Sequence, residues 1–356
     1  IRSERRGINM NYPIIDCHAD TFSKILLNKK RTKQFTSFGI TKPDYLKYQE
    51  INIERTRKSN LRIQTQSLYI GDSMLDKPLC HALEIIAIML EHVKEKDDLY
   101  IVKTFDEDDW QSKYGILISI EGLEVIENNL DLLDVFYELG VRMIAPTWNR
   151  ITRWFTPITE KGGMLSKGKE LIDKLNSINT LLDISHLSDQ SVYDLEKLYQ
   201  GTIIASHSNI RNINASPRNL TDDEITIIKE RNGLIGVNFF YDFLHSDAQA
   251  MKDKYNRFEF SEQVNYNREY ENSDMDLYPI GYLWIVEILE YLDKMNALDC
   301  VCFGSDFDGI HKFCPGLENP TGLISLQQFL RKAKISEDII AKLFYQNALR
   351  VFKTVL

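Results

Sequence analysis

The sequence contains little cysteine, and its five cysteines form no recognisable disulfide or metal-binding pattern. Their number is odd, and no Cys-x-x-Cys spacing occurs among Cys17, Cys80, Cys300, Cys302 and Cys314. A disulfide framework is therefore not expected, and a reducing compartment is favoured, so we predict a cytoplasmic location. Cys300 and Cys302 lie in an apolar run, where buried thiols are common.

Long apolar runs and a surplus of positive charge are also missing. No stretch approaches the roughly 18 residues of a membrane span. The first nine residues, IRSERRGIN, are polar and basic without the apolar segment of a signal peptide. We expect these residues, 1–9, to be a tag or a disordered extension before Met10. The formal net charge of −9 argues against a nucleic-acid partner and against an anionic membrane surface.

Apolar residues are plentiful, at 43% of the chain, and they fall in short runs that alternate with helical patterns. Runs rich in Ile, Val and Leu without alternation are typical of parallel strands buried on both faces. Eight such runs separated by helices predict an α/β fold, a (β/α)8 TIM barrel. We expect one barrel domain over residues 10–356, with a polar, aromatic insertion around 241–278. The predicted strands cover 14–18, 63–70, 115–121, 141–146, 180–186, 202–207, 234–240 and 299–306.

Histidine is scarce, yet three of the seven histidines stand at the ends of predicted strands. His18 ends the first run and is followed two residues later by Asp20, so both side chains leave the strand end together. Two later runs end in His186 and His207, and the run 115–121 ends in Glu121. Barrel enzymes carry their chemistry at the carboxyl ends of the strands, so these residues are predicted to meet in the barrel mouth.

Two carboxylates and three imidazoles without a thiolate suit Zn²⁺ or another first-row ion. We expect one ion on His18, Asp20 and Glu121 and a second on Glu121, His186 and His207, because a carboxylate can bridge two cations. Two ions roughly 3.5–4 Å apart can activate water and polarise a carbonyl group. For any one histidine, an ordinary core or surface role is the alternative.

Other candidates surround this predicted centre. Asp306, in FGSDFDGI, ends the last strand and could carry a proton, with Asp308 as its competitor for that role. Arg218 follows a turn after the sixth strand and could bind a carboxylate through two hydrogen bonds, or form a local ion pair instead. Tyr69 and Trp148 could line a substrate pocket, although large aromatic side chains more often belong to the core.

Several segments, in this order along the chain, make the sequence resemble the renal (membrane) dipeptidase family of the amidohydrolase superfamily. The most specific are IIDCHAD, ISIEG, DISHLS, ASHSN, SPRNLTD and FGSDFDG, and the resemblance extends over nearly the whole chain from Met10. It implies a barrel with a binuclear zinc centre, hydrolysis of dipeptides, and a homodimer. By the same matching, Glu121 bridges the two zinc ions, Arg218 holds the substrate carboxylate and Asp306 handles the proton.

One position departs from the family pattern. Mammalian members carry a Thr-His pair after the fourth strand, and here the pair is Thr147-Trp148. This change leaves open how the oxyanion is stabilised, with Asn149 or Arg150 as possible helpers. We therefore predict a zinc-dependent dipeptidase, with a D-residue at the C-terminal position of the substrate as one option. The alternatives are another amidohydrolase reaction, such as deacylation of N-acyl amino acids, and a non-catalytic metal-bearing scaffold that binds peptides.

Overall fold

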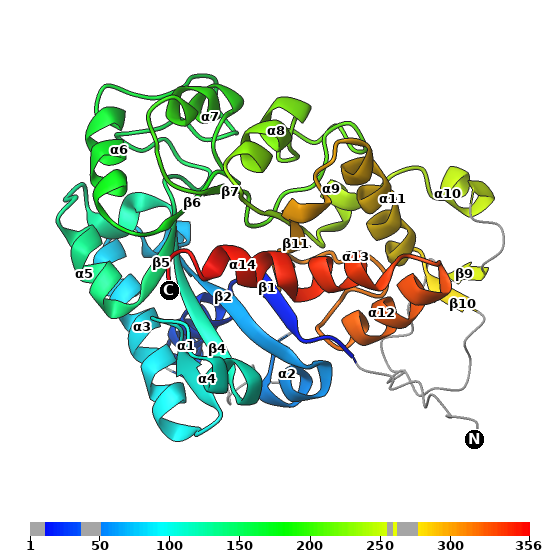
Figure 1. Cartoon of the computed structure of the whole chain (residues 1–356). Coiled ribbons are helices and arrows are strands. Elements are labelled where there is room, and N and C mark those ends of the chain that lie inside the picture. Colours follow the sequence, from blue (N-terminus) through cyan, green and yellow to red (C-terminus); the bar gives the residue numbers. More distant parts are fainter. Residues whose placement is uncertain (1–10, 37–50, 255–258, 262–276) are drawn as a thin grey trace.

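A computed structural model of the chain describes residues 11–36, 51–254, 259–261 and 277–356. Parallel strands form its centre and helices surround them (Figure 1). The hydrogen-bonded order is β7-β6-β5-β4-β2-β1-β11-β8. These strands are β1 (Ile14–Ala19), β2 (Leu61–Tyr69), β4 (Tyr114–Glu121), β5 (Val141–Ala145), β6 (Leu181–Asp183), β7 (Ile203–Ile204), β8 (Ile235–Val237) and β11 (Val301–Phe303).

The two ends of this sheet meet, which closes the barrel. A parallel bridge joins Ala205, just after β7, to Ile235 of β8. Two backbone hydrogen bonds of 2.8 Å, from Ala205 to the Leu234 carbonyl and from Gly236 to the Ala205 carbonyl, complete this contact. The predicted (β/α)8 barrel is therefore confirmed, with all eight strands at their predicted places in the chain.

The structure differs from the prediction in the extent of four strands and, within the barrel sheet, in one additional strand. β6, β7, β8 and β11 end earlier than predicted, because side chains take over the backbone groups that a longer ladder would use. Asp183 Oδ1, for example, accepts the backbone N–H of Ser185 at 3.0 Å. The additional strand, β3 (Leu99–Ile101), pairs with β4 outside the closed ring.

Helices follow the strands as the alternating pattern requires. Several begin at a residue whose side chain caps the helix: Thr221 and Glu224 form a capping box at α8, and Ser336 accepts the N–H of Ile339 at α13. The helices are α1 (Thr21–Thr36), α2 (Ile53–Ser59), α3 (Pro78–Glu95), α4 (Glu107–Ser112), α5 (Leu132–Leu139), α6 (Gly168–Ser177), α7 (Asp189–Glu196), α8 (Asp222–Glu230), α9 (Tyr241–Leu244), α10 (Ala248–Lys254), α11 (Gly281–Lys294), α12 (Gly322–Lys332), α13 (Glu337–Ala341) and α14 (Asn347–Phe352).

The apolar core has two parts. The larger part lies between the strands and the surrounding helices. The smaller part gathers apolar side chains from the barrel strands, such as Ile15, Leu117 and Cys302, with Val351 and Phe352 of α14. Figure 1 shows α14 lying across β1 and β11, which it contacts. The buried thiols of Cys17 and Cys302, 3.4 Å apart, belong to this smaller part.

Two expectations about the chain's organisation fall on parts that the structure does not describe. Residues 1–9 lie outside the described ranges, as does much of the expected insertion around 241–278. The described pieces of that segment are α9, α10, and the parallel pair of β9 (Glu259–Ser261) and β10 (Leu277–Pro279). Among the helices of the described ranges, none has both the length and the apolar character needed to cross a bilayer.

Candidate metal centre

Six side chains that end barrel strands lie together in one buried cluster. His18 and Asp20 come from the end of β1, Glu121 from the end of β4, and His186 and His207 from the turns after β6 and β7. Asp306 follows β11, and each of the six is at most 9% exposed. The structure thus places the five predicted metal ligands and the predicted proton carrier at one site.

Glu121 lies between two groups of ligands. Its Oε2 is 3.7 Å from His18 Nε2, and its Oε1 is 3.0 Å from His186 Nε2 and 3.7 Å from His207 Nε2. Around His18 Nε2 stand two further carboxylates, Asp20 Oδ2 at 3.6 Å and Asp306 Oδ1 at 4.0 Å. A carboxylate with one oxygen toward each group is placed to bridge two cations.

Hydrogen bonds leave the Nε2 atoms of two histidines facing each other across the centre. His186 Nδ1 lies 3.1 Å from the side-chain oxygen of Asn149, which can only accept, so the proton of the neutral ring is assigned to Nδ1. His207 Nδ1 lies 2.7 Å from Ser206 Oγ. The two Nε2 atoms are 2.9 Å apart, and with both Nδ1 atoms protonated they would present two lone pairs to a cation. Such lone pairs are metal ligands.

Two further observations indicate that the cluster can hold a cation. In the described part of the chain, buried His18 Nε2 and Asp20 Oδ1 have no hydrogen-bond partner. Two donors that each sit about 2.1 Å from one tetrahedral ion are about 3.4 Å apart. The separations of 3.6–4.0 Å around His18 Nε2 come close to that value.

The electrostatics of the cluster also favour added positive charge. Burial disfavours protonated His18, but Glu121, Asp20 and Asp306 outweigh burial and raise the His18 pKa to about 10. Burial would raise the pKa of Glu121, but His18 and His186 lower it to about 2. The pKa of Asp20 rises to about 7 through burial and the charge of Glu121. The acids therefore attract a cation into the position where the His18 proton lies.

His186 and His207 differ from His18, because they stay neutral. Burial and the nearby Arg218 lower the pKa of His186 to about 4. Burial and the charge of His18 bring the pKa of His207 well below its usual range. A neutral imidazole is the form that binds a metal, so neither histidine has to lose a proton first.

Glycine at position 309 keeps the space between two carboxylates open. A Cβ there would lie 2.3 Å from Asp20 Oδ2 and 2.3 Å from Asp306 Oδ1. Real side chains do not approach this closely, so an alanine at 309 would displace both carboxylates.

The two candidate aspartates after β11 have different partners. Asp306 faces the cluster, whereas Asp308 accepts from Thr21 Oγ1 at 2.7 Å and pairs with Lys24 at 3.1 Å, away from the cluster.

Arg218 reaches the edge of the centre. Its Nη2 is 3.3 Å from His186 Nε2 and 3.4 Å from the His207 carbonyl. Its Nη1 donates to the carbonyl of Ser185 and, at 3.2 Å, to Ser208 Oγ. The guanidinium is therefore held by the turns after β6 and β7. A local ion pair was the alternative for Arg218, but the nearby Asp222 accepts hydrogen bonds from Asn212 and Tyr291.

An aromatic wall stands beside the centre. The rings of Tyr69 and Trp148 are 5.0 Å apart, and Trp148 is 6.3 Å from the His186 ring. Arg150 lies over Trp148 at 4.8 Å and is fixed by Asp72 at 2.6 Å and Glu124 at 3.3 Å. Both predicted pocket aromatics thus lie at the site, whereas Arg150 is committed to acids.

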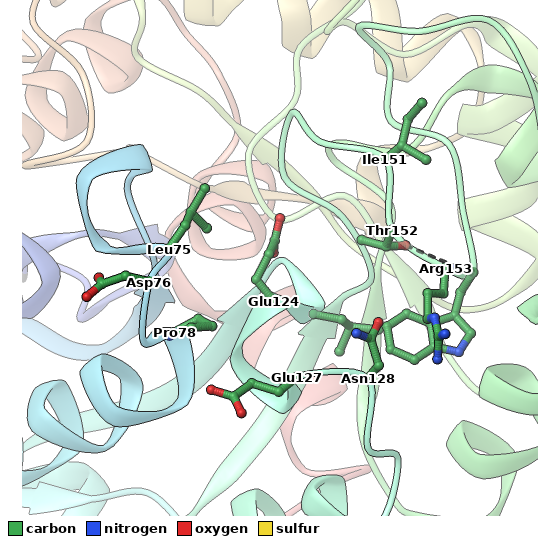
Figure 2. A pocket seen from close by; sticks show the side chains of 11 residues that line it. Leu75, Asp76, Pro78, Glu124, Glu127, Asn128, Ile151, Thr152 and Arg153 are labelled. Atoms are coloured by element: carbon green, nitrogen blue, oxygen red, sulfur yellow. Dashed lines mark hydrogen bonds between the residues drawn. The ribbon is translucent and has the colours of Figure 1, made fainter.

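A cavity of about 620 Å³, which Glu124 helps to line, contains none of the six cluster residues and neither Tyr69 nor Trp148. Figure 2 shows Asp76 and Arg153 on opposite sides of it, with Glu124 and Glu127 between them.

A separate group of side chains with metal-ligand chemistry, Cys80, His81 and Glu84, occurs on α3. Lys30 Nζ lies 2.6 Å from His81 Nδ1 and 3.0 Å from Glu84, so an ammonium group already neutralises that group.

Sequence reasoning overlooked several groups that hold the ligands. Ser67 Oγ donates to Glu121 Oε2 at 2.9 Å, and Asn238 Nδ2 donates to Asp306 Oδ2 at 3.1 Å. Asn238 follows β8 directly, but it lies inside the predicted run 234–240, so the sequence pattern did not mark it as a strand end. Ser67 lies inside β2, where nothing in the pattern distinguishes it.

A closed parallel barrel with buried His, Asp and Glu side chains at the strand ends defines the class: a metal-dependent hydrolase of the TIM-barrel type. A model of the family described as membrane dipeptidase (peptidase family M19) matches residues 2–356. The chain belongs to this family.

Individual relatives agree with the family match. An uncharacterized protein from the PQQ-III 3′ region of Acinetobacter calcoaceticus is 36% identical over 151 residues, which are 40% of this chain and 48% of that protein. The match thus spans about half the length of that relative. Dipeptidase 3 of Mus musculus is 24% identical over 364 residues, covering 100% of this chain and 67% of that protein.

The solved structures support the fold. A metallo peptidase from Rhodobacter sphaeroides, liganded with a phosphinate mimic of the dipeptide L-Ala-D-Ala, superposes with a TM-score of 0.77 at 21% sequence identity. The superposition covers 98% of this chain and 100% of that chain.

Proposed function

We propose that this chain is a zinc-dependent dipeptidase that hydrolyses the peptide bond of dipeptides with a free C-terminal carboxylate. One observation carries the proposal: a buried cluster of three imidazoles and three carboxylates has a guanidinium, that of Arg218, at its edge. The family membership and the dipeptide mimic bound to the R. sphaeroides protein support it.

The residues that would hold two Zn²⁺ ions are His18, Asp20 and Glu121 for one, and Glu121, His186 and His207 for the other. When bound, the two ions would lower the pKa of a water molecule and polarise the scissile carbonyl group. The donors are nitrogen and carboxylate oxygen, which suit zinc.

Asp306 is placed to carry the proton. Burial raises its pKa above the usual value. Asn238 holds Oδ2, so that Oδ1 faces the centre, 4.0 Å from His18 Nε2. In the proposed reaction this carboxylate accepts a proton from the attacking water and delivers it to the departing nitrogen.

Arg218 is placed to bind the substrate carboxylate. Its contacts to His186 Nε2 and the His207 carbonyl are long, 3.3 and 3.4 Å. Its shorter contact, to the Ser185 carbonyl, anchors the guanidinium from behind. Metal ligation by His186 would remove one long contact and leave Nη2 available for a carboxylate oxygen. A carboxylate held by Arg218 beside His186 would limit the substrate to one residue beyond the scissile bond.

Tyr69 and Trp148 form the wall that a substrate side chain would contact. Their rings pack together, and Arg150 is held in place by Asp72 and Glu124, so the wall is rigid. Trp148 stands where the mammalian pattern has histidine, and its indole N–H can donate a hydrogen bond but cannot carry a positive charge. We therefore propose that the metal pair takes the larger part in stabilising the oxyanion, and that the site accepts a D-residue at the C-terminal position, as in the R. sphaeroides ligand.

A second candidate is deacylation of N-acyl amino acids, because this substrate has the same amide and the same free carboxylate. The decisive assay offers purified, zinc-loaded protein a panel of dipeptides, including L-Ala-D-Ala, and a matched panel of N-acyl amino acids. Release of amine from dipeptides at a higher kcat/KM is expected. Preference for the acyl panel would replace the proposed activity with the second candidate, and no turnover would favour a metal-bearing scaffold that binds peptides.

Three further properties belong to this proposal. Metal analysis of protein purified without chelators is expected to give two zinc ions per chain. Sedimentation is expected to give a homodimer, as the family resemblance implies. The five cysteines are free, with Cys17 and Cys302 buried as thiols, which favours the cytoplasm; cell fractionation tests this location.

A further inference from the structure

A buried carboxylate outside the centre holds His207 from two sides. Asp183, at the end of β6, is 3% exposed and accepts four hydrogen bonds. Its Oδ1 accepts from the backbone N–H and the hydroxyl of Ser185, at 3.0 and 2.6 Å, and from the backbone N–H of Ser206 at 2.9 Å. Its Oδ2 accepts from the Ser206 hydroxyl at 2.5 Å.

Ser185 and Ser206, which both bond Asp183, each form a further hydrogen bond with His207. The hydroxyl proton of Ser185 goes to Asp183, so Ser185 Oγ accepts the backbone N–H of His207 at 3.2 Å. The hydroxyl proton of Ser206 also goes to Asp183, so toward His207 Nδ1, at 2.7 Å, Ser206 Oγ can only accept. The proton of the neutral His207 ring is therefore on Nδ1, and the lone pair is on Nε2, which faces Glu121.

The same construction occurs a second time in the barrel. Asp16, in β1 and 1% exposed, accepts the backbone N–H of Ser305 at 2.8 Å and its hydroxyl at 2.5 Å. Ser305 directly precedes Asp306, as Ser206 directly precedes His207. Asp306 has a left-handed backbone, with φ of 63°, which is uncommon for residues other than glycine, although aspartate adopts it more readily than most.

We infer that Asp183 is a positioning residue that, through Ser206, fixes the tautomer and ring orientation in which His207 offers Nε2 to a metal ion. Asp16, acting on Asp306 through Ser305, is the counterpart that sets a backbone and not a tautomer. The inference rests on the proposed function for its metal, but the tautomer exists in the metal-free protein. Carboxylates that orient metal-binding histidines typically change metal affinity by about 10- to 100-fold when they are altered.

Asp183→Asn separates this role from general stability. The amide oxygen can replace Oδ1 and keep its three bonds, so that Nδ2 takes the place of Oδ2. Nδ2 then donates to Ser206 Oγ, whose own proton turns toward His207 Nδ1. The ring proton moves to Nε2, and the nitrogen that faces Glu121 loses its lone pair. Asp16→Asn is the matched control, because Asp16 is equally buried yet Ser305 touches no imidazole.

The experiment measures the nitrogen-15 NMR shifts of His207 in metal-free protein and the Zn²⁺ affinity by chelator competition. We expect Asp183→Asn to convert His207 from the Nδ1–H to the Nε2–H tautomer. We also expect it to lower the affinity for whichever of the two zinc ions binds more weakly by about 10- to 100-fold. Asp16→Asn should leave the tautomer unchanged. An unchanged tautomer and an affinity within twofold in Asp183→Asn would overturn the inference.

If Asp183→Asn does not fold, Ser206→Ala decides. This variant removes the acceptor of His207 Nδ1 while Asp183 keeps both bonds from Ser185. A mixture of tautomers with weaker zinc binding supports the inference, and wild-type values overturn it. Should wild-type protein show the Nδ1–H tautomer but bind no zinc, the proposed function would be wrong while the positioning of His207 by Asp183 would stand.

Discussion

Replacing Glu121 by glutamine tests the bridge between the two proposed metal positions. The substitution removes a full negative charge near neutral pH, because His18 and His186 lower the pKa of Glu121 to about 2. Ser67 donates to Oε2, so the glutamine carbonyl oxygen is expected there, with the NH2 group in the place of Oε1. That group would then donate to His186 Nε2, which Oε1 now faces at 3.0 Å.

Either orientation of the amide removes one ligand. An NH2 group has no lone pair for a metal, so one ion loses its bridging oxygen whichever way the side chain turns. We expect bound zinc to fall from two ions toward one per chain, and kcat/KM for dipeptides to fall about 10³-fold or more, which is about 4 kcal/mol in activation free energy. The assays are metal analysis after dialysis and steady-state kinetics.

The matched control is Glu124→Gln, which removes a carboxylate three residues away that pairs with Arg150 and not with the cluster. It should keep two zinc ions per chain. A Glu121→Gln protein that retains both ions and turns over within tenfold of the wild type would show that Glu121 is not the bridge.

Three other changes address the remaining parts of the site. Gly309→Ala should lower kcat/KM about 10²-fold with little change in melting temperature, because its Cβ would displace Asp20 and Asp306 from positions 2.3 Å away; wild-type kinetics would contradict the open space we describe. Arg218→Ala should raise KM for dipeptides about 10- to 100-fold, the value of a charge-assisted hydrogen bond, with kcat nearly unchanged; a flat KM would remove the carboxylate assignment. Chelation of the metal should abolish turnover and lower the melting temperature, and added Zn²⁺ should restore both; activity that survives exhaustive chelation would rule out a metal mechanism.

The barrel was predictable because its signal is local. Uninterrupted Ile, Val and Leu runs mark strands that are covered on both faces, and the order of strands follows from the alternation with helices. The additional strand β3 was not predicted, since its three residues, Leu99–Ile101, give too short a pattern and lie outside the closed ring.

The ends of the strands were harder to predict than their positions, because side chains that bond across the sheet decide where each strand ends. The run 180–186 has Leu181, Leu182 and Ile184 around a single aspartate, so pattern alone extends the strand to His186. In the structure Asp183 takes the backbone N–H of Ser206, which lies 23 positions further along the chain. A contact of this kind depends on the register between β6 and β7, and no local pattern contains that register.

The contrast between local sequence signals and contacts made by the fold also explains which residues of the site the sequence revealed. Histidine is rare, so His18, His186 and His207 at three strand ends stand out even without a structure. Serine and asparagine are common in turns, so Ser206 and Asn238 carry no signal until the barrel closes through the bridge from Ala205 to Ile235. Pairing brings the end of β7 beside the end of β6, closure brings it beside the end of β8, and only then does a hydroxyl acquire the partners that orient an imidazole. The ligands of such a centre can therefore be inferred from chemistry at strand ends, whereas the groups that aim them have to be seen in the fold.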